Sequence, residues 1–221
     1  EEDIDALQAD LDRELTCIPL YRWFDSLGAK EPKLSKQHAD RQRLIRKFKK
    51  MYRMHLHALL ELWQQTQDGQ DGGFFDAEEE HACQAVQNMD RHALERLDEL
   101  RGLFPDLAEP WTHPSAAPYY DKIRGALEGS SGLVIAGGHV AILRNRMFFF
   151  GLRKLLAEFL SQGKPVFTWS AGAMALAEKI VLFYDDPPEG KGHAEVLDRG
   201  LGLLPAILLP HASERLDLSD L

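Results

Sequence analysis

Two strand–turn–helix units in succession constrain the fold of this chain more than any other feature. The first unit begins with a β-branched apolar run at residues 132–136, followed by a Gly-rich turn and a helical pattern over 141–160. The second begins with an apolar run at 165–169, followed by small residues and a helical pattern that ends near Ile180. This alternation is typical of parallel sheets with crossover helices. We therefore expect an α/β fold, a mostly parallel sheet flanked by helices, with a further strand at 207–210.

The first 105 residues show a different pattern, in which apolar residues recur every three or four positions. Such spacing predicts helices with one apolar stripe each. The stripes are Ile4, Leu7, Leu11 and Leu15; Leu44, Phe48, Met51, His55, Leu59 and Trp63; and Ala82, Val86, Met89, Ala93, Leu97 and Leu100. Several prolines between 105 and 118 then indicate a linker. We divide the chain into a helical region with a Pro-rich linker, 1–118, and an α/β catalytic region, 119–221.

Composition excludes several classes of protein. With 44% apolar and 28% charged residues the chain is an ordinary globular protein, and its net charge of −9 argues against a nucleic-acid-binding role. The two cysteines, Cys17 and Cys83, are too few for a disulfide framework or a four-cysteine zinc site. No apolar run is long enough to span a membrane, and the acidic N-terminus lacks the basic region of a signal peptide. We expect a cytoplasmic protein that binds neither nucleic acid nor membrane.

The polar residues of the helical region carry no clear chemistry. Residues 41–53 hold seven Lys or Arg, and we interpret them as a solvated helix face, with a basic helix for RNA, a membrane or a partner as the alternative. Histidines such as His55 and His57 stand two residues apart and cannot chelate one ion from a helix. We therefore expect no metal and no cofactor.

Ser170 is the strongest candidate for a chemical role. It stands where the run at 165–169 turns into a helix, and its neighbours Ala171, Gly172 and Ala173 are small. Such a turn lifts the hydroxyl off the sheet edge, and the N–H of Ala171 could act as a donor to an oxyanion. Gly138, in the turn after the neighbouring strand, could supply a second donor. The alternative is that Ser170 merely caps the helix, which serine does well.

A nucleophilic serine needs a base, and His211 follows the apolar run 207–210 at the expected end of another strand. The order of serine before histidine, with an acid nearby, is compatible with a hydrolase triad. His211 could also be a core or surface histidine.

These motifs together resemble the dipeptidase E and cyanophycinase family of serine peptidases, which has a class I glutamine-amidotransferase-like, flavodoxin-like fold. The elbow V-F-T-W-S-A-G-A-M (166–174), the strand and turn I-A-G-G-H (135–139), and the G-L-G-L-L (200–204) and P-H-A-S-E-R (210–215) segments agree with the family in order and spacing. The similarity covers roughly residues 130–216.

The resemblance implies a serine hydrolase that cleaves peptide bonds through an acyl-enzyme. Ser170 would be the nucleophile, His211 the base, and Gly138 and Ala171 the oxyanion hole. The third member of the triad would be Asp185 or Asp186, with Glu189 and Glu195 as alternatives. A family preference for acidic substrates points to Arg215, and then to Arg144 or Arg146, as the cation that binds the substrate carboxylate.

The chain also departs from the family. His139 replaces the usual Asn or Asp, and Thr168 replaces a frequent Gly. We identify no strands before residue 132, and the final strands of the family are missing, so we expect the α/β region to be incomplete: a fragment or a divergent member. An alternative function is a catalytically inactive amidotransferase-like scaffold that binds a partner. The sequence is also compatible with a homo-oligomer. The serine at the elbow argues against a cysteine-type amidotransferase.

Overall fold

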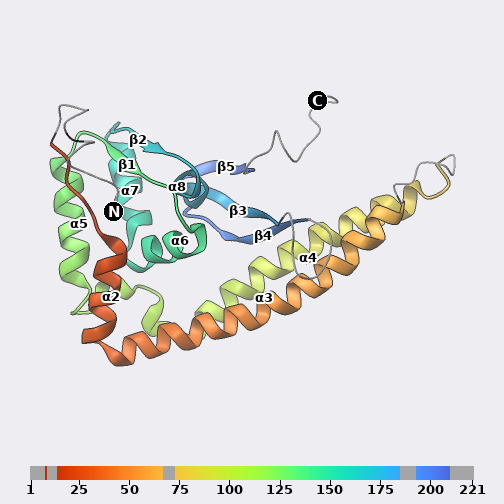
Figure 1. Cartoon of the computed structure of the whole chain (residues 1–221), viewed down its shortest axis with the longest axis horizontal. Coiled ribbons are helices and arrows are strands. Elements are labelled where there is room, and N and C mark those ends of the chain that lie inside the picture. Colours follow the sequence, from red (N-terminus) through yellow and green to blue (C-terminus); the bar gives the residue numbers. More distant parts are fainter. Residues whose placement is uncertain (1–7, 9–13, 67–72, 185–192, 210–221) are drawn as a thin grey trace.

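The computed structural model describes residue 8 and residues 14–66, 73–184 and 193–209, and its elements are drawn in Figure 1. From Leu20 onward the N-terminal part is helical, as predicted. The stripe predicted at Ile4, Leu7 and Leu11 lies outside the described residues, and Leu15 is not in a helix. The α-helices of this part are α2 (Leu20–Lys30), α3 (Pro32–Thr66) and α4 (Asp76–Gly102), followed by the 3-10 turns Pro105–Leu107 and Pro110–Thr112. Helices α3 and α4 form a long antiparallel hairpin whose far end projects away from the rest of the molecule (Figure 1).

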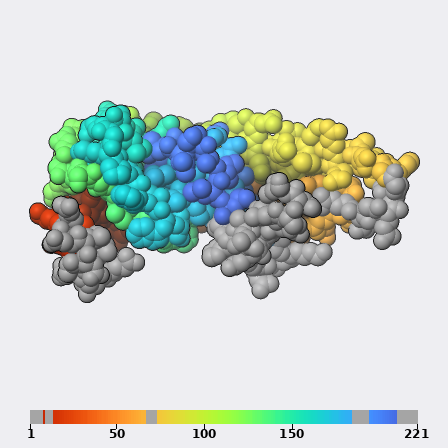
Figure 2. Space-filling model, turned by 90° about the horizontal axis from the view of Figure 1, so that it is seen from above, coloured from red at the N-terminus to blue at the C-terminus, as the bar shows by residue number. Residues whose placement is uncertain are grey.

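The C-terminal part mixes helices and strands. Its elements are α5 (Ala117–Gly129), β1 (Leu133–Ile135), α6 (Val140–Phe149), α7 (Leu152–Ser161), β2 (Val166–Thr168), α8 (Ala171–Leu176), β3 (Ala177–Tyr184), β4 (His193–Arg199) and β5 (Leu204–Leu208). Viewed from above, the blue β4 and β5 lie between the cyan part of the chain and the yellow end of the hairpin (Figure 2).

The sheet differs from the prediction. Strands β1 and β2 pair in parallel, as expected, but they form a separate two-stranded sheet. A second sheet has the order β4-β3-β5, in which β5 is parallel to β3 and β4 is antiparallel to it. The described residues therefore form a mixed α/β arrangement of two small sheets rather than one mostly parallel sheet.

Two helix predictions in this part were partly wrong. The pattern over 141–160 forms two helices, because Gly151 adopts a left-handed conformation with φ +68° between them. The helix expected to reach Ile180 ends at Leu176, and the chain continues as β3. Ala177, Glu178 and Lys179 are good helix formers in isolation, but Ala177 and Ile180 are completely buried in the sheet, so tertiary packing overrides local propensity here.

The main hydrophobic core joins both halves of the sequence. It combines leucines of α2 and α3 with apolar side chains of α5, α6, α7 and β1, around the fully buried Phe150 and Leu156. A smaller cluster joins Val140 of α6 to Ala171 and Met174 of α8 and to Ile180 of β3. The division of the chain at residue 118 stays a prediction, and the main core draws on both sides of it.

The stripe predicted for α3 was wrong by about one position. The buried residues of α3 are Leu34, Ile45, Tyr52 and Leu56, which face α4 or the core. Leu44 and Met51, which belong to the predicted stripe, are exposed. The stripe predicted for α4 is confirmed, because Ala82, Ala93 and Leu97 are buried.

Candidate active site

Ser170 lies in the turn between β2 and α8, at the carboxyl end of β2. Its backbone has φ +53° and ψ −130°, and among the described residues it is the one non-glycine residue with positive φ. This conformation costs of order 1–3 kcal/mol and persists only where the surroundings enforce it. Its side chain is exposed, so the turn presents the hydroxyl to solvent, as a nucleophile elbow requires.

Two close approaches, each at a glycine, enforce this turn. A Cβ added to Gly172 would lie 2.5 Å from the carbonyl oxygen of Ile135 at the end of β1. A Cβ added to Gly137, in the turn after β1, would lie 2.9 Å from Cβ of Ser170 and 3.1 Å from its Oγ. Only glycine fits at either position, so the two neighbouring turns pack directly against each other. Gly137 was given no role of its own from the sequence, although its place in the Gly-Gly pair was the signal.

The backbone around Ser170 leaves a donor available. The Ser170 carbonyl accepts from the Met174 N–H at 3.1 Å, and the Trp169 carbonyl accepts from the Gly172 N–H at 3.1 Å. Among the described residues, the N–H of Ala171 donates to no acceptor outside α8. Ala171 is the first residue of that helix, so its N–H has no acceptor within the helix either. Helix α8 has six residues, less than two turns, so its dipole contributes little and this single N–H is the relevant feature.

The serine does not act as a helix cap. Ser170 occupies the N-cap position of α8, but its side chain makes no capping hydrogen bond, and its φ is far from the extended backbone of an N-cap residue. The alternative interpretation of Ser170 as a plain cap therefore finds no support in the geometry.

Gly138 follows Gly137 and adopts φ +126°, a region that side chains rarely enter, although an added Cβ would meet open space there. The positive φ explains why glycine is needed at this second position. It turns the chain from β1 into α6, whose first helical residue, Val140, packs in one cluster with Ala171. The turns that hold Gly138 and Ala171 thus start neighbouring helices at the same edge of the β1–β2 sheet.

The other candidate catalytic residues lie outside the described residues. These are the base His211, the acids Asp185 and Asp186, the alternative acid Glu189 and the substrate-binding Arg215. Their roles stay predictions.

Three alternatives named from the sequence are described: Glu195, Arg144 and Arg146. Glu195 on β4 is buried and forms an ion pair with Arg53 of α3 at 3.5 Å. Arg144 of α6 is buried and donates to the carbonyl of Arg199 at 2.8 Å. Neither group is available as a triad acid or as a substrate cation in this arrangement. Arg146 stacks on the ring of Phe24 in α2, 3.4 Å from its centroid.

Asp198 on β4 is the middle of a charged centre that has no local signal in the sequence. Arg101 of α4 binds it at 2.5 Å, and Arg144 of α6 lies 3.4 Å from its other oxygen. Lys49 of α3 donates to the carbonyl of the adjacent Leu197. Burial acts to raise the pKa of Asp198, but Arg144, Arg101 and Lys49 outweigh it, and the pKa is lowered. Burial in turn lowers the pKa of Lys49 to about 8.

This charged centre corrects our interpretation of the basic segment. Three of the seven cations at 41–53 point inward: Lys49, Arg53, and Arg41, which donates to the Leu107 carbonyl at 3.1 Å. The segment is thus only partly a solvated face. Its inner side attaches the helical hairpin to the sheet.

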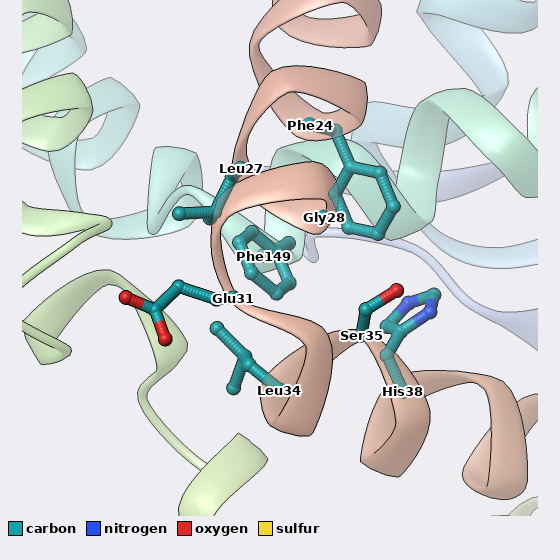
Figure 3. Close-up of a pocket in the computed structure, with 8 residues that line it drawn as sticks. All are labelled: Phe24, Leu27, Gly28, Glu31, Leu34, Ser35, His38 and Phe149. Atoms are coloured by element: carbon teal, nitrogen blue, oxygen red, sulfur yellow. The ribbon is translucent and has the colours of Figure 1, made fainter.

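A small hollow lies at the opposite end of α6 from the Ser170 turn, and Figure 3 shows its lining. It is lined by Phe24, Leu27, Gly28, Glu31, Leu34, Ser35, His38 and Phe149. The hollow is mostly apolar and remote from Ser170, so we do not assign it to a peptide. Among the described residues we find no group of three or more His, Cys, Asp or Glu arranged to hold a metal, and no helix long and apolar enough to cross a membrane.

Comparison with known proteins bears directly on this turn. Residues 113–218 match the sequence profile of Peptidase family S51. The chain carries a Peptidase family S51 domain. Both the Ser170 turn and the neighbouring Gly137-Gly138 turn fall inside the matched segment, whereas the α3–α4 hairpin falls outside it.

Individual relatives match shorter stretches. Peptidase E of Shewanella baltica is 32% identical over 92 residues, which is 40% of this chain and 35% of the relative. The pyridoxal 5'-phosphate synthase subunit PdxT of Geobacillus kaustophilus is 42% identical over 64 residues, 29% of this chain and 32% of the relative. The chain therefore spans about a third of the length of these relatives. No solved structure matches the chain significantly. The match to the Peptidase family S51 profile confirms the resemblance drawn from the sequence. It implies the class I glutamine-amidotransferase-like fold, although the described sheets are small.

Proposed function

We propose that this chain is a serine peptidase of the dipeptidase E type, which hydrolyses amide bonds through an acyl-enzyme on Ser170. The observation that carries the proposal is the backbone of Ser170, a non-glycine residue with φ +53° at the end of a parallel strand, inside the S51 segment. Such strain at an exposed serine has no use in packing, and it serves to present a hydroxyl to a substrate.

The chemistry follows the usual order for acyl transfer. His211 takes the proton of the Ser170 hydroxyl as its oxygen attacks the substrate carbonyl, and the N–H groups of Ala171 and Gly138 stabilise the oxyanion. The tetrahedral intermediate then expels the amine, which receives the proton from His211. Water, activated by the same histidine, hydrolyses the ester and frees Ser170. Asp185 or Asp186 would orient the histidine.

The substrate side of the proposal is a peptide with an acidic residue on the acyl side of the cleaved bond. Arg215 would pair with that carboxylate, since a guanidinium offers two parallel donors. Trp169, which is exposed immediately before Ser170, together with the exposed Phe167, offers an apolar surface beside the scissile bond. Cleavage of Asp-X, Ala-X and Lys-X dipeptides by the wild type and by Arg215→Ala tests this. Equal wild-type rates on all three would eliminate the acidic preference.

A fluorophosphonate probe tests the nucleophile directly. We expect the wild type to be labelled at Ser170, and Ser170→Ala to lose labelling and at least about 10³-fold in peptide turnover while its unfolding midpoint changes little. Ser161→Ala is the matched control, because Ser161 is also exposed but ends a helix, where its hydroxyl donates to the Glu158 carbonyl. A wild type that neither reacts with the probe nor hydrolyses peptides would favour the alternative, an inactive scaffold that binds a partner.

A further inference from the structure

The outer side of α3 carries a second apolar stripe besides the one that packs on α4. Leu44, Met51 and Leu62 are exposed, and their spacings of seven and eleven residues return to the same side of a helix to within about 20°. Met54 lies next to them and is 63% exposed. Large apolar side chains repeated along one helix side are the pattern of a helix–helix seam. This stripe therefore indicates a surface made to be covered.

The stripe faces away from the rest of the described molecule. Lys49 and Arg53 reach β4. Around the axis of α3, these two side chains lie more than a third of a turn away from the stripe. Figure 1 shows α4, β4 and the α/β part on the other side of α3, and no described helix or strand along its outer side. A second helix could pack there without meeting the α/β part.

Exposed charges of one sign gather at two places on the hairpin. The base of α3 exposes Arg43, Arg46, Lys47 and Lys50, whereas the tip of α4 exposes Asp76, Glu78 and Glu80. Because α3 and α4 are antiparallel, the acidic tip lies beside the end of α3 and not beside its basic base. About twenty residues of helix, or roughly 30 Å, separate the two groups. Within one chain they are too far apart to neutralise each other.

We propose that this stripe binds a second copy of the same chain, with the two hairpins antiparallel as a four-helix bundle. A two-fold axis near residue 53 would set Leu44 opposite Leu62 of the second copy, with Met51 and Met54 near the axis. The same operation brings the acidic tip of each hairpin to the basic base of the other, twice per dimer. Isologous contacts of this kind are the commonest form of protein oligomer.

Sedimentation across a range of concentrations tests the interface with the full chain. We expect the wild type to dimerise and Met51→Gln with Leu62→Gln to raise the dissociation constant at least about tenfold, because the seam loses its apolar contacts. Leu160→Gln is the matched control, an exposed leucine on α7 outside the hairpin. Circular dichroism verifies that each variant retains its helices. A wild type that stays monomeric at every concentration would overturn the proposal.

Charge reversal separates a second copy from any other partner. Variant A carries Arg46→Glu and Lys47→Glu, and variant B carries Glu78→Lys and Glu80→Lys. Each alone places like charges together at both ends of the dimer and should associate at least about tenfold more weakly than the wild type. A mixture of A and B restores opposite charges at both ends and should form a heterodimer of wild-type affinity. If A or B alone dimerises like the wild type, or if mixing restores nothing, the antiparallel arrangement is wrong.

Discussion

The Ser170 turn and the joint between the hairpin and β4 are held in opposite ways. At the turn, the backbone at Gly172 lies against backbone oxygens of β1 and its following turn, and Gly137 lies against the Ser170 side chain, so neither glycine leaves room for a side chain of its own. At the joint, long charged side chains from α3, α4 and α6 converge on Asp198 and Glu195. The first arrangement fixes a geometry to within a few tenths of an ångström. The second fixes which segments lie together but tolerates small movements, because long side chains can follow them.

The difference predicts what each region loses on mutation. A change at the turn should affect turnover more than stability, and a change at the joint should affect stability more than turnover. Three substitutions and one change of pH test this contrast.

Asp198→Asn should have the largest effect on stability. It removes the negative charge that balances Arg144, Arg101 and Lys49, and leaves buried cations without their partner. Breaking a buried pair from one side costs about 3–5 kcal/mol. Denaturant unfolding measures this loss. Asp121→Asn is the matched control, because the Asp121–Arg124 pair, at 3.9 Å, is exposed to solvent and should leave the stability nearly unchanged when it is lost. Equal losses in the two variants would mean that the joint is not held by its charges.

Acid should weaken the helical side through His38. The ring packs against Phe24 and Phe149, and burial, with Arg41 and Arg146 nearby, lowers its pKa from 6.5 to about 4. Between pH 6.5 and pH 4, His38 is therefore protonated in the unfolded chain but neutral in the folded chain. The contribution of neutral His38 to the free energy of unfolding is fully present above pH 6.5. It falls by up to about 3 kcal/mol as the pH drops from 6.5 to 4.

The measurement is the free energy of unfolding at pH 7 and at pH 4.5 for the wild type and for His38→Gln. The variant lacks the titrating ring, so the difference between the two pH values should shrink in it. An unchanged difference would assign the acid sensitivity to other groups.

Gly172→Ala tests the turn itself. The added methyl group would meet the Ile135 carbonyl oxygen at 2.5 Å and the Ala136 carbonyl oxygen at 2.9 Å, so the Ser170 turn must move away from β1. Overpacking of this kind costs about 1–3 kcal/mol. Displacement of the nucleophile by about 1 Å should reduce kcat/KM by about 10²-fold.

The control for this variant is Gly125→Ala, a helical glycine in α5 where a Cβ meets nothing within 4 Å. That change should raise helix propensity and leave kcat/KM unaltered. Full activity in Gly172→Ala would contradict the role of the close approach.

The sequence predicted the turn much better than the joint, for a physical reason. A tight turn demands particular small residues at fixed spacing, so Gly138, Ser170 and Ala171 could be identified from local pattern alone. The joint depends on which segments meet in space. Asp198 is one acid among many in the sequence, and only the packing of α4 and α6 onto β4 reveals its partners.

The errors have related causes. The exposed stripe of α3 was predicted as buried because periodicity shows that a helix has an apolar side but not what covers it. The end of α8 was misplaced because Ala177–Lys179 favour helix locally, while pairing with β4 and β5 decides otherwise. The division into two small sheets has no local signal at all, since it depends on long-range pairing.

Tyr52→Phe should have the smallest effect and should separate the two regions most cleanly. Tyr52 is buried within the hairpin, and its hydroxyl donates to the Asp90 carboxylate at 2.5 Å. Burial is the main cause that raises the pKa of Asp90, and the Tyr52 hydrogen bond opposes it. Loss of a hydrogen bond to a charged acceptor costs about 1.5 kcal/mol, with little change in packing because the ring remains. Denaturant unfolding should show this loss while kcat/KM stays at the wild-type value, since Tyr52 interacts with Asp90 of α4 and with the Val196 backbone of β4 rather than with the Ser170 turn. A fall in kcat/KM comparable with that of Gly172→Ala would show that the hairpin and the turn are coupled, and would contradict the contrast drawn between them.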